Sequence, residues 1–168
     1  MIRCLLLSAC ALIAAPAAAW GPTGHRASAL IAEGNLSGHT RAHVQAILGS
    51  QTLAEAATVP DEQRSNPDPF WQASSPWHRI SLPRGGRVED VVHPQQGDAL
   101  TALDGFIATL RDPDASREER QTALQFVVHL VADLHLPVHV NDGVHGGGTP
   151  RVNWFGQQQS VHWLWDEG

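Results

Sequence analysis

Residues 126–139 read FVVHLVADLHLPVH, and this stretch decides how the chain folds. His129 and Asp133 are four residues apart, so on a helix both lie on one face. Apolar residues recur at helical spacing around them, at Leu124, Val127, Val128, Val131 and Leu134. Pro137 cannot continue a regular helix, and His139 follows just past it. The stretch predicts a buried helix that ends beside two imidazoles and a carboxylate, which are good zinc ligands.

The first nineteen residues have the pattern of an export signal. Arg3 supplies a positive charge, residues 4–15 are apolar, and residues 17–19 are the small residues that a signal peptidase cuts after. A lipoprotein signal at Cys10 is the alternative, but cleavage there leaves almost no hydrophobic core. The apolar run is too short and too alanine-rich for a good membrane span. We therefore expect cleavage between Ala19 and Trp20, a secreted or periplasmic protein, and no stable membrane anchor.

The remaining 149 residues are enough for one domain with its own core, so the expected division is 1–19 and 20–168. They contain ten arginines, no lysine and seventeen acidic residues, which gives a formal charge of −7. Such a chain does not hold nucleic acid by a broad basic surface. A phosphate-ester substrate needs local positive charge, and metal ions are the obvious source. Both cysteines lie in the leader, which leaves no disulfide and no thiolate ligand.

Periodicity and capping signals predict a mainly helical chain with long loops. We expect helices ending at residues 34–35, over 40–48, over 52–59 before Pro60, over 97–110, and from a capping box at Ser116 and Glu119 into the central stretch. Residues 65–77 and 141–150 are expected to be loops, His78 to lie in an extended piece, and 151–155 to form a strand or turn. His39 and His43 are assigned to a solvated face, His93 to a loop without a partner, and His135 to a different helical face from His129.

The candidate metal ligands share residue types, imidazole and carboxylate, and they recur along the whole chain. They are His25, Asp61, His78, His129, Asp133, His139, His162 and Asp166. Nitrogen and oxygen ligands without sulfur suit zinc, and manganese or iron less well. Eight ligands are too many for one tetrahedral site and suit two or three. Clustered metal ions are a known solution for phosphoryl transfer.

The sequence resembles the zinc-dependent nucleases of the S1/P1 type, whose helical fold is shared with zinc-dependent phospholipase C. The matching motifs are Trp-Gly-x-x-Gly-His at 20–25, Pro-Asp-x-x-Arg at 60–64, Trp-His at 77–78, His-x-x-x-Asp-x-His-x-Pro-Val-His at 129–139, and His-x-x-x-Asp at 162–166. Each motif alone is weak, but they occur in the family's order across the mature chain. The resemblance implies a mainly α fold and hydrolysis of single-stranded DNA, RNA and 3′-nucleotides.

The resemblance also implies three zinc ions and their ligands. The first ion would be held by Asp61, His78, His129 and Asp133. The second would be held by His25, by Asp133 as a bridge, and by the amino nitrogen and carbonyl oxygen of Trp20. The third would be held by His139, His162 and Asp166.

The family's mechanism assigns roles to the same residues. A hydroxide bridging the first two ions would attack phosphorus in line, with Asp61 orienting that water. The third ion would stabilise the departing 3′-oxygen, and Arg64 would hold a phosphate oxygen. No protein partner is implied, and the substrate is single-stranded nucleic acid or a nucleotide.

The sequence departs from the family in its loops and in its length. His145-Gly-Gly-Gly-Thr149 replaces the usual Asp-x-Gly-Gly-Asn, and Ser160-Val161 replaces Asn-Leu before His162. Family members continue well past the last ligand, whereas this sequence ends two residues after Asp166, so we expect a domain incomplete at its C-terminal end. The alternatives are a phospholipase C on the same metal site and an inactive exported zinc-binding fragment.

Overall fold

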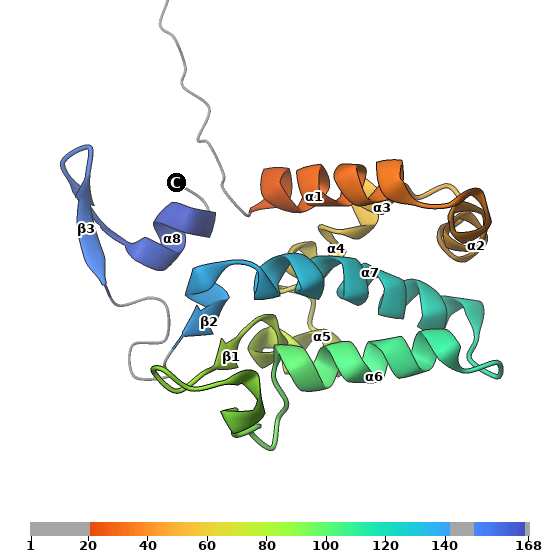
Figure 1. Ribbon diagram of the computed structural model, residues 1–168. Coiled ribbons are helices and arrows are strands. Elements are labelled where there is room, and N and C mark those ends of the chain that lie inside the picture. The colour runs from red at the N-terminus through yellow and green to blue at the C-terminus, as the bar shows by residue number, and fades with distance from the viewer. Residues whose placement is uncertain (1–20, 142–149, 167–168) are drawn as a thin grey trace, which may run out of the picture.

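The computed structural model describes residues 21–141 and 150–166 of the chain. These residues are mainly helical, with four short strands, and the predicted mainly α fold is confirmed (Figure 1). No helix in the described ranges is both long and apolar enough to cross a membrane. The expected leader, Trp20 and His145 lie outside the described residues.

The elements follow one another along the chain, with short 3₁₀ helices labelled η. They are α1 (Pro22–Asn35), α2 (Gly38–Leu48), α3 (Leu53–Ala56), α4 (Val59–Glu62), α5 (Pro69–Ala73), η1 (Ser75–His78), β1 (Ile80–Ser81), η2 (Val88–Asp90), α6 (Ala99–Arg111), α7 (Arg117–Leu134), η3 (Pro137–His139), β2 (Val140–Asn141), β3 (Arg151–Trp154), β4 (Gln157–Ser160) and α8 (Val161–Asp166).

Helix α7 is the central element, and its start is the predicted capping box. The Ser116 hydroxyl accepts a hydrogen bond from the Glu119 amide at 3.2 Å, and the Glu119 carboxylate accepts one from the Ser116 amide at 2.7 Å. The side chains most deeply buried on α7 are Phe126, His129, Leu130 and Asp133, at helical spacing. The candidate ligands therefore lie on the core-facing stripe itself. Val131, assigned to the apolar stripe from the sequence, is instead 43% exposed.

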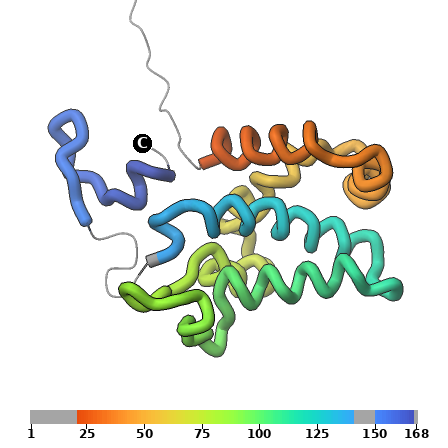
Figure 2. Tube along the Cα trace, in the orientation of Figure 1, coloured from red at the N-terminus to blue at the C-terminus, as the bar shows by residue number. Residues whose placement is uncertain are grey.

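The helices form layers around α7, with α1 on one side and α6 on the other (Figures 1 and 2). On the α1 side, a cluster of small and aliphatic residues joins α1, α2, α3 and α7: Ala29, Leu48, Leu53, Ala56, Ala57 and Leu124. On the α6 side, Phe106 stacks on Phe126 with ring centroids 4.4 Å apart, and Trp71 stacks on the same phenylalanine at 5.6 Å. Both cores hold α7 firmly in place.

A two-residue parallel pairing of β1 with β2 connects distant parts of the chain. Ile80 pairs with Val140, so the 3₁₀ helices that precede the two strands are brought together. His78 ends one of these helices and His139 ends the other. The strands β3 and β4 form a separate antiparallel hairpin, so of the strand or turn expected over 151–155 the structure has a strand, and the hairpin leads into α8.

Three expectations about local structure are wrong, and two of them concern prolines. The single helix expected over 52–59 is two short helices, and Pro60 lies in the first turn of α4 rather than ending a helix. A proline fits there because the first turn needs no amide donor from it. Within the expected loop over 65–77, Pro69 likewise begins α5, where the Asp68 carboxylate accepts from the Phe70 amide at 2.8 Å. His78 ends a 3₁₀ helix and is not extended.

The interpretation of His93 is also wrong. Its Nδ1 lies 2.7 Å from the Asp98 carboxylate, which also caps the start of α6. In the sequence, His93 and Asp98 are five residues apart, and helical spacing does not place residues at this separation next to each other. The contact depends on the turn at Gly97, where φ is +82°.

Candidate metal centre

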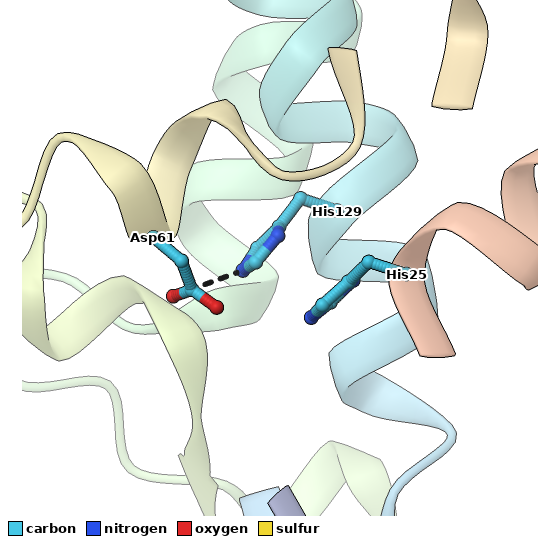
Figure 3. A group of neighbouring side chains, drawn as sticks. All are labelled: His25, Asp61 and His129. Carbon is cyan, nitrogen blue, oxygen red and sulfur yellow. Dashed lines mark ion pairs between the residues drawn. The ribbon is translucent and has the colours of Figure 1, made fainter. Parts of the chain in front are cut away.

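All eight candidate ligand side chains lie within the described residues, and six elements supply them. His25 comes from α1, Asp61 from α4, His78 from η1, His129 and Asp133 from α7, His139 from η3, and His162 and Asp166 from α8. They form three groups whose ligand atoms lie within 4.8 Å of one another: His25 with Asp61 and His129, His78 with His129 and Asp133, and His139 with His162 and Asp166. Figure 3 shows the first group, converging from α1, α4 and α7.

Four ligand atoms have separations close to those of a tetrahedral zinc site. His78 Nδ1 and His129 Nε2 are 2.9 Å apart, and each is 3.1 Å from Asp133 Oδ2. Asp61 Oδ1 lies 3.8 Å from the first nitrogen and 3.7 Å from the second. Zinc bonds of about 2.05 Å imply ligand–ligand distances of about 3.3 Å at a tetrahedral centre. Both the residue types and their spacing therefore fit zinc.

Backbone carbonyls orient two of the imidazoles. His129 Nδ1 donates to the Ala57 carbonyl at 2.8 Å, and His139 Nδ1 donates to the His78 carbonyl at 2.6 Å. A carbonyl only accepts, so in each ring Nδ1 carries a proton, and in the neutral form of the ring the lone pair on Nε2 faces the candidate ligands. Fixing the far nitrogen in this way is the usual second contact of a metal-binding histidine.

The two carboxylate oxygens of Asp133 face different groups. Oδ2 lies against His78 and His129, while Oδ1 is 3.3 Å from His25 Nε2. The ring of His25 stacks on that of His129 with centroids 3.9 Å apart. The carboxylate is almost completely buried, at 1% exposure, and it stands between two sets of nitrogen ligands. A carboxylate in this position could bridge two metal ions.

The third group is more open. His139 Nε2 lies 3.3 Å from Asp166 Oδ1, and His162 Nε2 lies 2.7 Å from Asp166 Oδ2. The two imidazoles stack with centroids 4.9 Å apart. His139 is buried, whereas the side chains of His162 and Asp166 are 25% and 20% exposed. Three protein ligands at a partly exposed site leave a coordination position for water or substrate.

The charges in the centre shift the protonation of its members. Burial favours the neutral form of Asp133, but hydrogen bonds from the surrounding histidines hold the pKa of this carboxyl well below its ordinary value. Burial also opposes the charge on His139, yet the Asp133 and Asp166 carboxylates raise its pKa to about 10. The pKa of His78 is lowered, chiefly by burial. A buried carboxylate among imidazoles is thus kept ionised, as a metal ligand must be.

A pocket of about 300 Å³ opens onto this centre. Its lining includes His25, Asp61, Asp133, His139 and Asp166, together with Gly21, Pro22, Glu62 and Arg64. The Nε atom of Arg64 lies 2.8 Å from Asp61 Oδ1, and its side chain is 54% exposed. This guanidinium is a positive charge at the pocket, and among the described residues its remaining donors have no partner and can meet an anion.

The sequence pattern described as S1/P1 Nuclease matches residues 20–168. The chain belongs to the S1/P1 nuclease family. It is 31% identical to nuclease S1 of Aspergillus oryzae over 176 residues, which cover 99% of this chain and 60% of that protein. It is 28% identical to nuclease P1 of Penicillium citrinum, over 88% of this chain and 57% of that one. Endonuclease 4 of Arabidopsis thaliana is 28% identical over 88% of this chain and 54% of its own length. The chain therefore spans a little more than half the length of these relatives.

In this member of the S1/P1 nuclease family, the eight candidate ligand side chains all lie within the described residues. The structure gathers the eight side chains into three groups, and five of them line one pocket, whereas Trp20 lies outside the described residues. Its neighbour Gly21 is described: the Gly21 amide donates to the Asp166 carbonyl at 2.7 Å. The start of α1 is therefore attached to the third ligand group.

Sequence reasoning missed three contributors to this centre. The carbonyls of Ala57 and His78 hold imidazoles, and a carbonyl leaves no mark in a sequence because every residue has one. Glu62 lines the pocket, where its carboxylate accepts from the Thr58 hydroxyl at 2.7 Å. The sequence signal for Glu62 was its place between Asp61 and Arg64.

Proposed function

We propose that this chain carries the metal centre of a zinc-dependent phosphodiesterase that hydrolyses single-stranded DNA and RNA and 3′-nucleotides. Membership of the S1/P1 nuclease family supports a nuclease activity. The observation that carries the proposal is the convergence of three histidine–aspartate groups on one pocket. Because the chain spans 60% of nuclease S1, the activity is proposed for the protein as a whole.

The proposed ligand assignment is the one that the resemblance to the family implies, and the distances between the side chains support it. One zinc ion would be held by Asp61, His78, His129 and Asp133, whose atoms have tetrahedral spacing. A second would be held by His25 and the other oxygen of Asp133, together with the amine and carbonyl of Trp20. A third would be held by His139, His162 and Asp166. Three zinc ions per chain is the resulting proposal.

The protein's own groups bind and orient the substrate. When bound, zinc supplies Lewis acidity, which lowers the pKa of a water molecule and polarises the phosphate. The carboxylate of Asp61 is 29% exposed at the pocket wall, so it can accept a hydrogen bond from the attacking water. The exposed N–H groups of Arg64 donate to a phosphate oxygen and stabilise the charge that grows on it in the transition state.

The position of the centre favours single strands. His129 and Asp133 are 0% and 1% exposed, so a phosphate reaches the centre only by entering the pocket. A single strand bends freely enough to present one phosphate there, whereas a duplex holds its backbone on a stiff cylinder. With a formal charge of −7 after the leader, attraction to the substrate must come from the bound ions and Arg64.

We infer that the protein acts outside the cytoplasm. The motivation is the leader over residues 1–19 and the position of Gly21 at the pocket. Cleavage between Ala19 and Trp20 frees an α-amine beside the metal centre, and an amine with a pKa near 8 is accessible to zinc at neutral pH.

The test is hydrolysis by the zinc-loaded mature protein, with single-stranded DNA, the same sequence as a duplex, and phospholipid micelles as substrates. We expect cleavage of the single strand well above that of the duplex and none of the lipid. Asp61→Asn is expected to abolish it, while Asp104→Asn, an exposed carboxylate on α6, serves as the matched control. Lipid cleavage would instead indicate a phospholipase C, and a zinc-loaded protein without either activity would indicate a zinc-binding fragment.

A further inference from the structure

A second arrangement of histidines lies on α2, outside the metal centre. His39 and His43 are four residues apart and both are exposed. Their Nε2 atoms are 3.2 Å apart and their ring centroids 4.5 Å. The sequence predicted the solvated face correctly but not this contact between the rings. We propose that His39 and His43 form a surface site that chelates a divalent transition-metal ion of the copper, nickel and zinc class.

The distance between the two nitrogens suits one ion. Metal–imidazole bonds of about 2.05 Å require neighbouring nitrogens to be about 2.9 to 3.3 Å apart, from square-planar to tetrahedral geometry. The observed 3.2 Å falls in this interval, so both rings are already placed for chelation. Without a metal, one neutral imidazole donates to the other. When an ion binds, the donor ring transfers its Nε2 proton to solvent and takes one up at Nδ1, so that both Nε2 lone pairs face the ion and solvent completes its coordination.

The scaffold holds this geometry without help from a metal. The Ser37 hydroxyl caps α2 by accepting from the Thr40 amide at 3.1 Å. Leu48 is buried in the core at the other end of the helix, and Val44 and Ile47 pack against it. The backbone that carries the two rings is thus ordered by capping and packing, which lowers the entropy lost on binding.

The pair is separate from the metal centre. Figure 1 shows α2 at the end of α1 opposite α8, and His25 lies in the first turns of α1. Helix α1 has 14 residues, and at about 1.5 Å per residue it is about 21 Å long. Two imidazoles in water, with no third protein ligand among the described residues, make an exchangeable site. Copper(II) binds such a pair more tightly than zinc.

The experiment titrates copper(II) into the zinc-loaded protein by equilibrium dialysis, with the release of zinc and the hydrolysis of DNA measured in the same samples. We expect one copper ion to bind without loss of zinc. His39→Ala and His43→Ala are each expected to weaken this binding roughly a hundredfold, because a second ligand on one scaffold acts at high effective concentration. His135→Ala removes another exposed histidine and is the matched control, with binding unchanged within about twofold.

A further variant keeps the number of histidines on the helix. His43→Ala combined with Gln45→His places the second imidazole on another side of α2, since residues six apart do not share a face. It is expected to bind copper as weakly as His43→Ala. The proposal is overturned if this variant or His39→Ala binds copper like the unchanged protein, or if copper binds only as zinc is released. Unchanged DNA hydrolysis in each variant shows that its fold is intact.

Discussion

Asp133 is the residue on which the most contacts of the metal centre depend. Its oxygens face His25 on one side and His78 and His129 on the other. Without its negative charge, two bound ions would repel each other across a buried space of low dielectric constant. A neutral amide of the same shape also presents N–H donors where a ligand needs lone pairs. The neighbouring histidine at 135, by contrast, is exposed and its Nδ1 donates to the Val131 carbonyl at 2.7 Å.

We therefore expect Asp133→Asn to lower hydrolysis of single-stranded DNA by more than about 100-fold, since loss of even an outer contact to a ligand costs 10- to 100-fold. The zinc content of the variant falls with it. His135→Ala is expected to keep its activity within about twofold, as is usual for surface substitutions. Steady-state assays and elemental analysis of both variants check this. Equal loss in the two would contradict the assignment of their faces on α7.

At the scale of elements, the start of α1 connects the two ends of the described chain. The Gly21 amide bonds to the carbonyl of Asp166 at the end of α8, and both residues line the pocket. The residue before Gly21 is the proposed metal ligand Trp20, whose amine is free only after the leader is cut. Removal of the leader would then complete the site as well as release the protein.

We expect protein that begins at Trp20 to be active, and protein with one extra residue before it to lose more than about tenfold of that activity. The longer form is expected to stay folded and to keep the zinc ion at His139, His162 and Asp166. The comparison uses purified forms whose amino termini are verified by intact mass. The same activity and zinc content in both would exclude Trp20 as a ligand and favour the lipoprotein signal at Cys10.

The elements also show how far the sequence leads. Helix α7 was predictable because its capping box and its Pro137 are local signals, and the candidate ligands could be chosen because they follow a family's motifs. The partners of those ligands were not. The bond of His129 to Ala57 joins residues 72 positions apart, and that of His139 to His78 joins residues 61 apart. Such contacts follow from packing and from the pairing of β1 with β2. Strands of two residues are too short to be predicted from a sequence pattern.

Prolines limited the prediction for a different reason. Pro60 was predicted to end a helix and Pro69 to lie in a loop, whereas each lies in the first turn of a helix. The same residue type fits both roles, because what matters is whether its amide is needed. In α4 this has a consequence for the centre, since Asp61 follows Pro60 directly and lies on the helix whose first turn contains the proline.

At the scale of the whole molecule, the candidate centre joins segments that are far apart in the sequence. It ties together α1, α4, α7, α8 and the two 3₁₀ helices that end at His78 and His139, elements spread over the described chain. A site assembled from distant segments does not exist in the unfolded chain, so the free energy of metal binding becomes free energy of folding.

Removal of zinc is therefore expected to lower the melting temperature strongly. One site at a free zinc concentration a thousand times its Kd contributes about 4 kcal/mol. In a domain of this size 1 kcal/mol shifts Tm by about 3 °C, so the loss of even one site lowers Tm by about 12 °C. Melts with and without a strong chelator measure the shift. An unchanged Tm after confirmed metal removal would show that metal binding to these ligands does not stabilise the fold.

The number of zinc ions per chain tests the central claim most directly. The measurement is elemental analysis of purified, folded protein that begins at Trp20, after dialysis against metal-free buffer has emptied weak surface sites such as the His39–His43 pair. The three proposed ligand sets predict a value approaching three zinc ions per chain. A value of one or fewer in a folded sample would contradict the clustered metal centre.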